Sequence, residues 1–215
     1  MGISNLFAAG GVVMWPLLGF SIVAIALIAE RLIFWFRINK RQPRVVRDAM
    51  SYYRHDPDTA LKKLKQNADL PIARIFLAAL ELEQPTPEEF RLALESEAQA
   101  EIPVLKRFNT VFETIISLAP LLGLLGTVLG LIYSFASLRL GDVGGGQAGG
   151  VTSGISEALV STASGLIVAI FTLLFSNAFR GFYIRQIALI QEYGGQLELL
   201  YRRYYEKGSR YASTR

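Results

Sequence analysis

The chain has no cysteine, a single histidine and no charged side chain among its first 29 residues. Without cysteine it can form no disulfide, no thiolate metal site and no cysteine nucleophile. The histidine, His55, stands beside Asp56 and Pro57 in a turn sequence, so we expect it on the surface. The sequence contains no nucleophile–base pair and no cluster of metal ligands, and it therefore predicts neither an enzyme, nor a metal site, nor a bound cofactor.

Basic side chains are missing from one long stretch of the chain. Fourteen Lys and Arg residues lie between residues 31 and 107 and seven from residue 180 onward, whereas Arg139 alone lies between 108 and 179. Hydrophobic residues make up 52% of the chain and the mean hydropathy is +0.35, which is typical of a membrane protein with sizeable aqueous parts. The basic residues are dispersed along predicted helices rather than gathered with aromatics on a groove, so no nucleic-acid partner is expected.

Three apolar stretches predict transmembrane helices, the first at residues 11–36. This stretch lacks the basic n-region of a secretory signal, so we expect an uncleaved span. Trp15 and Trp35 are twenty residues apart, roughly 30 Å along a helix, which predicts one indole at each membrane interface. The predicted fold class is an all-α membrane protein with three transmembrane helices and long cytoplasmic helical extensions.

Charge placement predicts the orientation of the spans. Lys and Arg gather on the cytoplasmic side of a membrane, which puts the N-terminus outside and the C-terminus in the cytoplasm. The predicted order is an N-terminal segment with the first span (1–36), a cytoplasmic helical domain (37–113), the second span (114–138), an external Gly-rich loop (139–150), the third span (151–179) and a cytoplasmic C-terminal helix (180–215).

The predicted cytoplasmic domain has clear helix signals. Asp58 is a candidate N-cap for a helix over 59–66, and Pro71 starts a second helix over 71–83. One face of that second helix is apolar: Ile72, Ile75, Phe76, Ala79 and Leu80. Thr86 begins a capping-box sequence, and little stops the helix after it except Pro103, where we expect a kink in one long helix over 87–138.

The second and third spans contain polar residues where lipid disfavours them. A carboxylate within a bilayer costs about 2.5–3.5 kcal/mol on insertion scales, so such residues usually face a protein interior or a water-filled path. On a helical wheel, Thr127 shares a face with Pro120, Gly123 and Ser134, while Thr162 lies about 140° from Glu157. A narrow polar stripe surrounds Glu157 on the third span: Ser153, Ser161, Ser164, Val168 and Thr172.

Two interpretations of these residues remain open. Serine and threonine in membrane helices often bond to their own backbone or to a neighbouring helix, which would make the hydroxyls structural. Alternatively, they line an ion path. Two small-residue pairs, Gly126 with Gly130 and Ser161 with Gly165, predict close helix approach. No Asp, Glu, His or Lys occupies the middle of a span, so a proton path would need a carboxylate from another polypeptide.

Two segments carry a resemblance to a known family. The segment SLAPLLGLLGTVLG (117–130), followed by GISEALVSTASGLIVA (154–169), resembles the hallmark of the ExbB/TolQ/MotA proton-channel family. Three spans make the chain similar to ExbB and TolQ rather than to MotA, which has four. The threonine of the family's Gly-Thr-Val element corresponds to Thr127, the glutamate of the third span to Glu157, and the threonine five residues later to Thr162.

The resemblance implies a bacterial inner-membrane protein with a periplasmic N-terminus, working as a pentamer around a central pore. It implies an ExbD/TolR-like single-span partner whose membrane aspartate supplies the missing acid, and a TonB/TolA-like protein energised by the proton-motive force. The expected ion-pathway and partner-facing residues are Thr127, Thr162, Glu157, Ser161, Ser134 and Ser164. A non-conducting membrane scaffold is the alternative, and both the ion, H⁺ or Na⁺, and the choice between ExbB and TolQ systems stay open.

Overall fold

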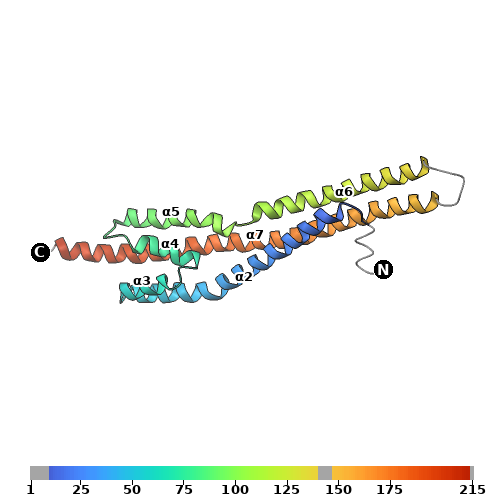
Figure 1. Cartoon of the computed structure of the whole chain (residues 1–215). Coiled ribbons are helices and arrows are strands. Elements are labelled where there is room, and N and C mark those ends of the chain that lie inside the picture. Colours follow the sequence, from blue (N-terminus) through green and yellow to red (C-terminus); the bar gives the residue numbers. More distant parts are fainter. Residues whose placement is uncertain (1–9, 140–146, 214–215) are drawn as a thin grey trace. The chain divides into compact units, whose positions relative to one another are not determined.

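All regular elements are α-helices in the part of the chain that the structure, a computed structural model, describes: residues 10–139 and 147–213. The centre of the predicted Gly-rich loop, residues 140–146, lies outside these ranges. The described helices (Figure 1) are α2 (Met14–Tyr53), α3 (Pro57–Lys65), α4 (Pro71–Leu80), α5 (Pro87–Leu105), α6 (Asn109–Arg139) and α7 (Gln147–Ser213). The predicted all-α class is confirmed.

Three helical stretches are long and apolar enough to cross a membrane: Met14–Tyr53, Pro87–Ser137 and Gly150–Glu206. Each contains most of one predicted span, and the chain is a multi-pass membrane protein by length and composition of its helices. The points at which each helix enters and leaves lipid remain predictions.

The helices pack into two compact units. The first, here the apolar unit, comprises Met1–Glu30 and Phe108–Phe179, and the second, the charged unit, comprises Arg31–Arg107 and Arg180–Arg215. Helices α2 and α7 contribute residues to both. The units are described separately because each has its own interior.

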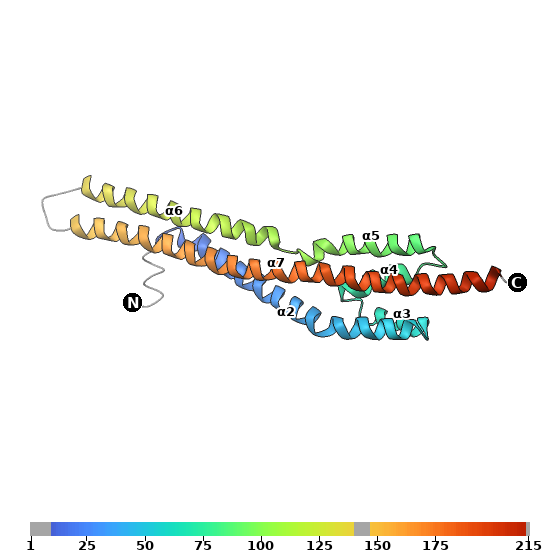
Figure 2. The same cartoon turned by 180° about the vertical axis from the view of Figure 1, so that it is seen from behind.

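In the apolar unit, α6 runs beside the first half of α7, as both views show (Figures 1 and 2). The start of α2 closes a small core with them, in which Val13, just before α2, and Leu17 of α2 meet Ala119 of α6 and Ala169 of α7. The buried residue that each of α6 and α7 contributes to this core is an alanine, and side chains of this size let the two backbones approach closely.

In the charged unit, α4 forms the centre. Four members of its predicted apolar face are buried, namely Ile72, Ile75, Phe76 and Ala79, while Leu80 is half-buried. The helix ends at Leu80 rather than at the predicted residue 83. Burial of a face of this kind supplies most of the free energy that holds a short helix in place.

Most buried polar side chains of the charged unit are paired, whereas the indole N–H of Trp35 has no hydrogen-bond partner among the described residues. The Arg74 guanidinium donates to both carboxylate oxygens of Glu101, which is 4% exposed, and to the carbonyl of Ala68. The side-chain amides of Gln42 and Gln186 donate to each other, at 3.3 and 2.6 Å. Buried polar groups are costly unless they are bonded in this way.

Two local predictions in the charged unit were wrong. The N-cap of α3 is Asp56, not Asp58: its carboxylate accepts from the backbone N–H and the hydroxyl of Thr59, which lowers the pKa of Asp56. The predicted single helix over 87–138 is broken at residues 106–108, where Phe108 adopts a left-handed φ of 69°. Pro103 lies inside the last turn of α5, and the Lys106 N–H still donates to the Ile102 carbonyl beyond it, so the helix does not end at the proline.

The predicted interfacial position of the two tryptophans stays a prediction, but their surroundings differ. Trp15 is 67% exposed, but Trp35 is 2% exposed and packs against Phe34 and Phe182 inside the charged unit. Residue spacing places an indole at a depth along the helix. It does not reveal that Trp35 shares the buried face of α2 with Arg31 and Ile38.

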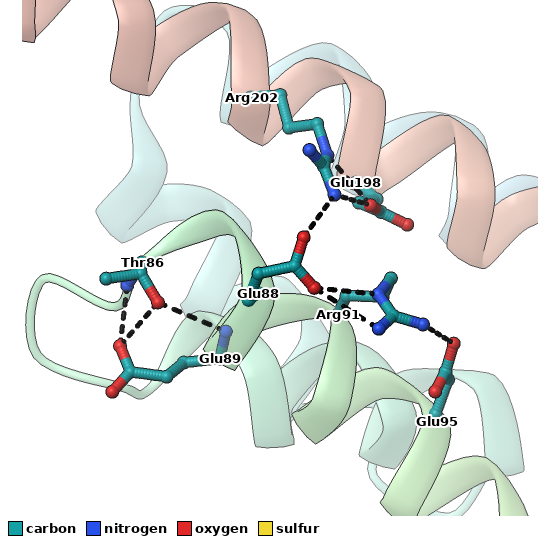
Figure 3. Close-up of polar contacts among 7 residues, drawn as sticks. All are labelled: Thr86, Glu88, Glu89, Arg91, Glu95, Glu198 and Arg202. Carbon is teal, nitrogen blue, oxygen red and sulfur yellow. Dashed lines mark hydrogen bonds and ion pairs between the residues drawn. The ribbon is translucent and has the colours of Figure 1, made fainter.

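The predicted capping box at the start of α5 is confirmed (Figure 3). The Thr86 hydroxyl accepts from the backbone N–H of Glu89, and the Glu89 carboxylate accepts from the backbone N–H of Thr86 at 2.7 Å. These bonds hold the pKa of Glu89 below its ordinary value of 4.5. Beside them, Glu88 accepts from Arg91 of its own helix and from Arg202 of α7, which lowers the pKa of Glu88 as well.

Replacing Thr86 by alanine removes the cap, and we expect it to lower the free energy of unfolding by about 0.5–2 kcal/mol at neutral pH. Because the pKa of Glu89 is lowered by folding, its contribution is complete above pH 4.5 and is lost as the pH falls from there towards the lower pKa of the folded state. Thermal unfolding of the purified protein at pH 7 and at acidic pH measures both effects. Thr86→Ser keeps the hydroxyl and is the control; a loss equal to that of Thr86→Ala would contradict the role of the cap.

Candidate functional site: the contact between α6 and α7

Two helix backbones touch where Gly130 of α6 meets Gly154 of α7. A Cβ atom added at Gly130 would lie 2.5 Å from the carbonyl oxygen of Gly154 and 2.9 Å from the nitrogen of Ala158. A Cβ at Gly154 would lie 2.4 Å from the carbonyl oxygen of Gly130. No side chain fits at either position, so glycine sets the distance between the helices.

The same contact continues along both helices. A Cβ at Gly165 would lie 2.4 Å from the carbonyl oxygen of Ala119, and one at Gly126 would lie 2.3 Å from the hydroxyl of Ser161. The close approach predicted for Gly126 with Gly130 and for Ser161 with Gly165 is confirmed. Such small-residue contacts hold membrane helices together because lipid gives no hydrophobic drive for their association.

Close approach brings hydroxyl groups of α7 to the backbone of α6. Thr162 donates its hydroxyl to the carbonyl oxygen of Gly123 at 3.1 Å. The hydroxyl of Ser161, which is fully buried, lies 3.0 Å from the carbonyl oxygen of Ala158 and 3.4 Å from that of Gly123. The consecutive side chains of Ser161 and Thr162 therefore both reach the carbonyl oxygen of Gly123. This oxygen has two lone pairs, so it can accept a hydroxyl in addition to its helical hydrogen bond.

Ser134 makes the equivalent contact from the other helix. It is 3% exposed, and its hydroxyl lies 3.0 Å from the carbonyl oxygen of Gly130 and 3.2 Å from that of Val151 on α7. Ser134 on α6 and the pair Ser161 and Thr162 on α7 thus bind the two helices together at two levels. Each such bond contributes about 0.6 kcal/mol on average in membranes.

Thr127 is placed differently. Its hydroxyl donates at 2.6 Å to the carbonyl oxygen of Leu124, one turn back on its own helix, and its side chain is half-buried. Among the described residues no hydrogen bond joins Thr127 to Thr162. Ser164 on α7 is likewise half-buried. Both residues keep surface that a neighbouring polypeptide can contact, and their predicted roles remain predictions.

Glu157 lies against the first turn before α2. Its carboxylate is so close to Gly11 that an added Cβ there would lie 1.6 Å from Oε1, and Gly11 has a left-handed φ of 70°. Val13, two residues later, lies beside Gly126, where an added Cβ would be 3.7 Å from the Val13 Cβ. The N-terminal end of α2, the Glu157 carboxylate and the contact of Gly126 with Ser161 therefore share one level of the apolar unit.

The residues of the polar stripe predicted around Glu157 contact different elements. Glu157 faces Gly11, just before α2, and Thr162 faces α6, in agreement with their separation on the wheel. Ser161 also contacts α6. Thr172 is buried and donates to the carbonyl of Val168, and Ser153 is exposed. The stripe is thus not one surface open to water along its length within the apolar unit.

Sequence reasoning missed Gly11 and the Gly123 carbonyl. The dipeptide Gly10–Gly11 directly before an apolar helix is a turn signal that marks a position able to adopt positive φ. The carbonyl of Gly123 has no side-chain signal at all. It becomes a binding group only because the absence of a Cβ opens the backbone to the neighbouring helix.

Comparison with known proteins identifies the family. The sequence model of the MotA/TolQ/ExbB proton channel family matches residues 67–192, a segment that contains all six predicted site residues. The chain is 62% identical over 209 residues to "Putative biopolymer transport protein ExbB-like 3" of Synechocystis sp., covering 96% of this chain and all of that protein. The chain belongs to the MotA/TolQ/ExbB proton channel family.

Two further relatives agree. "Putative biopolymer transport protein ExbB-like 1" of Synechocystis sp. is 44% identical over 199 residues, covering 91% of this chain and 78% of the relative. "Biopolymer transport protein ExbB" of Neisseria meningitidis serogroup A is 31% identical over 176 residues, covering 73% of this chain and 76% of the relative. The resemblance drawn from the two sequence segments is confirmed over most of the chain.

Gly165→Ala tests the contact between α6 and α7. The new Cβ collides with the carbonyl of Ala119, so the helices must separate, and we expect the free energy of unfolding to fall by about 1–3 kcal/mol. Gly181→Ala is the matched control on the same helix, because a Cβ there meets nothing within 4 Å and alanine favours the helix. Thermal unfolding in detergent compares the two; equal stability of both variants would refute close packing at Gly165.

Gly11→Ala tests the contact with Glu157. Alanine is strained at positive φ and its methyl group collides with the carboxylate, so we expect a loss of about 1–3 kcal/mol. In a Glu157→Ala background only the backbone strain remains, and the same substitution should cost at least about 1 kcal/mol less. The measurement is a double-mutant cycle on thermal unfolding, and an additive cycle would place the carboxylate away from Gly11.

Proposed function

We propose that this chain is the stator subunit of a proton-driven membrane machine in the bacterial inner membrane. Several copies, five in the expected pentamer, surround a single-span partner of the ExbD/TolR type. Proton flow through the assembly moves the partner and energises a TonB- or TolA-type protein that acts at the outer membrane. The N-terminus lies in the periplasm and the C-terminus in the cytoplasm, in keeping with the placement of Lys and Arg.

The observation that carries this proposal is the set of hydroxyls at the α6–α7 contact in a member of a proton-channel family. Thr162 is half-buried, and its bond to Gly123 leaves its oxygen lone pairs able to accept. A threonine hydroxyl can donate to an aspartate carboxylate and accept from the protonated acid. It therefore suits both protonation states of a partner's acid.

A partner acid is needed because the spans lack one at mid-depth. Glu157 stands beside Gly11, where the predicted first span begins. One elementary charge that crosses the membrane releases about 2.3 kcal/mol per 100 mV. The proposed role of Glu157 is to anchor the outer end of the first span and to give that level a negative charge that attracts cations.

The alternative is a scaffold that holds the partner without conducting. It is favoured by the hydroxyl bonds of Thr127 and Thr162 to backbone carbonyls of their own chain, which would satisfy both groups without an ion. A scaffold requires shape and close packing but no hydroxyl chemistry, so the two functions differ in what a hydroxyl deletion does.

Thr162→Val keeps the shape of the side chain and removes the hydroxyl. We expect an at least tenfold fall in partner-dependent proton flux into proteoliposomes, measured with a pH-sensitive dye, while the assembly with the partner persists in size-exclusion chromatography. Thr162→Ser restores the hydroxyl and should restore flux. Full proton flux in the Thr162→Val variant would exclude a conducting role for Thr162. If the Glu157→Ala and Thr127→Ala variants also showed normal energised uptake, the scaffold would be favoured.

A further inference from the structure

The outward face of α2 in the charged unit carries an unusual density of positive charge. Its buried face consists of Trp35, Ile38, Gln42, Val46 and Ala49. The opposite face carries five cations at helical spacing and a single carboxylate, that of Asp48: Arg37, Lys40, Arg41, Arg44 and Arg47. A face with so little compensating charge attracts anions.

A pocket opens on this face between α2 and the end of α3. Its volume is about 270 Å³, and its cationic walls come from Lys40, Arg41 and Arg44 of α2 and from Lys63 of α3. Gln66 and Asn67, in the turn after α3, add side-chain amides. No aromatic side chain lines it, which distinguishes it from a surface on which nucleic-acid bases stack.

One wall of the pocket is held in place by its own hydrogen bonds. Arg41 donates to Asn67 Oδ1 at 2.7 Å and to Asp69 Oδ2 at 2.6 Å. Asn67 in turn donates its side-chain amide to the carbonyl of Lys63 at 2.9 Å. The guanidinium of Arg41 and the turn that follows α3 are therefore positioned before any ligand arrives, which lowers the entropy lost on binding.

The charges of the pocket are not balanced from within. In the described ranges, Lys40, Arg44 and Lys63 form no ion pair, while Arg41 is paired with Asp69. Asp48 removes one further charge, so a net charge of about two remains. The C-terminal end of α3 adds only about half a negative charge. A site with this net positive charge is suited to a multivalent anion.

We propose that this pocket binds a phosphate group. The Arg44 guanidinium matches phosphate oxygens with its fork of N–H donors, Arg41 adds a second guanidinium charge, and two ammonium groups add point charges. Lys40 is four residues beyond Phe36, an exposed apolar residue, or roughly 6 Å along the helix. Either a soluble di- or triphosphate or the phosphate of an anionic lipid can therefore occupy the site. The proposal is independent of proton conduction.

The test measures binding of pyrophosphate to the full-length protein in nanodiscs by isothermal titration calorimetry. In zwitterionic phosphatidylcholine discs we expect saturable binding that weakens at high salt. Arg44→Gln and Lys63→Gln should each reduce the affinity roughly tenfold, because each removes a charge-assisted hydrogen bond. Arg37→Gln, on the same face of α2, and Arg54→Gln, in the turn after α2, are the controls. Each removes one charge outside this pocket and should change the affinity less than about twofold.

Discs rich in phosphatidylglycerol identify the source of the phosphate. If pyrophosphate binds equally well in both kinds of disc, the site takes a soluble phosphate compound. If pyrophosphate binds in zwitterionic discs but not in anionic discs, a lipid phosphate occupies the pocket. Absence of saturable binding in zwitterionic discs, or an equal loss in the Arg37 and Arg44 variants, would overturn the proposal.

Discussion

The contact between the backbones of α6 and α7 is the constraint on which the apolar unit depends. In lipid the burial of apolar side chains gives no net drive for helix association, so the helices must gain from van der Waals contact and hydrogen bonds. Gly130, Gly154 and Gly165 allow that contact because each faces a backbone atom of the other helix. The same closeness brings the hydroxyls of Ser161 and Thr162 to the Gly123 carbonyl. Packing and candidate chemistry therefore have one origin.

The charged unit is stabilised by different means. Its short helices have caps, a buried apolar face on α4 and paired polar groups such as Arg74 with Glu101. These are the devices of a domain surrounded by water, where apolar burial drives packing. The outward face of α2 carries several cations and a single carboxylate, and this distribution gives the pocket beside α3 its character.

The candidate site was predictable in its residue types and only partly in its contacts. The spacing of Gly126 with Gly130 and of Ser161 with Gly165 correctly indicated a close helix contact. The helical wheel placed Ser161 and Thr162 on different faces of the third span, yet both hydroxyls reach the Gly123 carbonyl. A helical wheel takes no account of side-chain length or of the groove on the neighbouring helix. The contact of Glu157 with Gly11 joins distant parts of the chain and leaves no local pattern.

The sequence by itself determined the all-α class, the three apolar helices, the capping box at Thr86 and the family, because hydropathy, helical periodicity and local motifs are properties of neighbouring residues. Only the tertiary structure decided that Trp35 is buried, that Asp56 caps α3, that the helix breaks at Phe108 and that Glu157 meets Gly11. Each of these depends on which side of a helix meets another element, or on competition between two nearby groups for one bond. Such outcomes follow from distances in the folded chain and not from the spacing of residues along it.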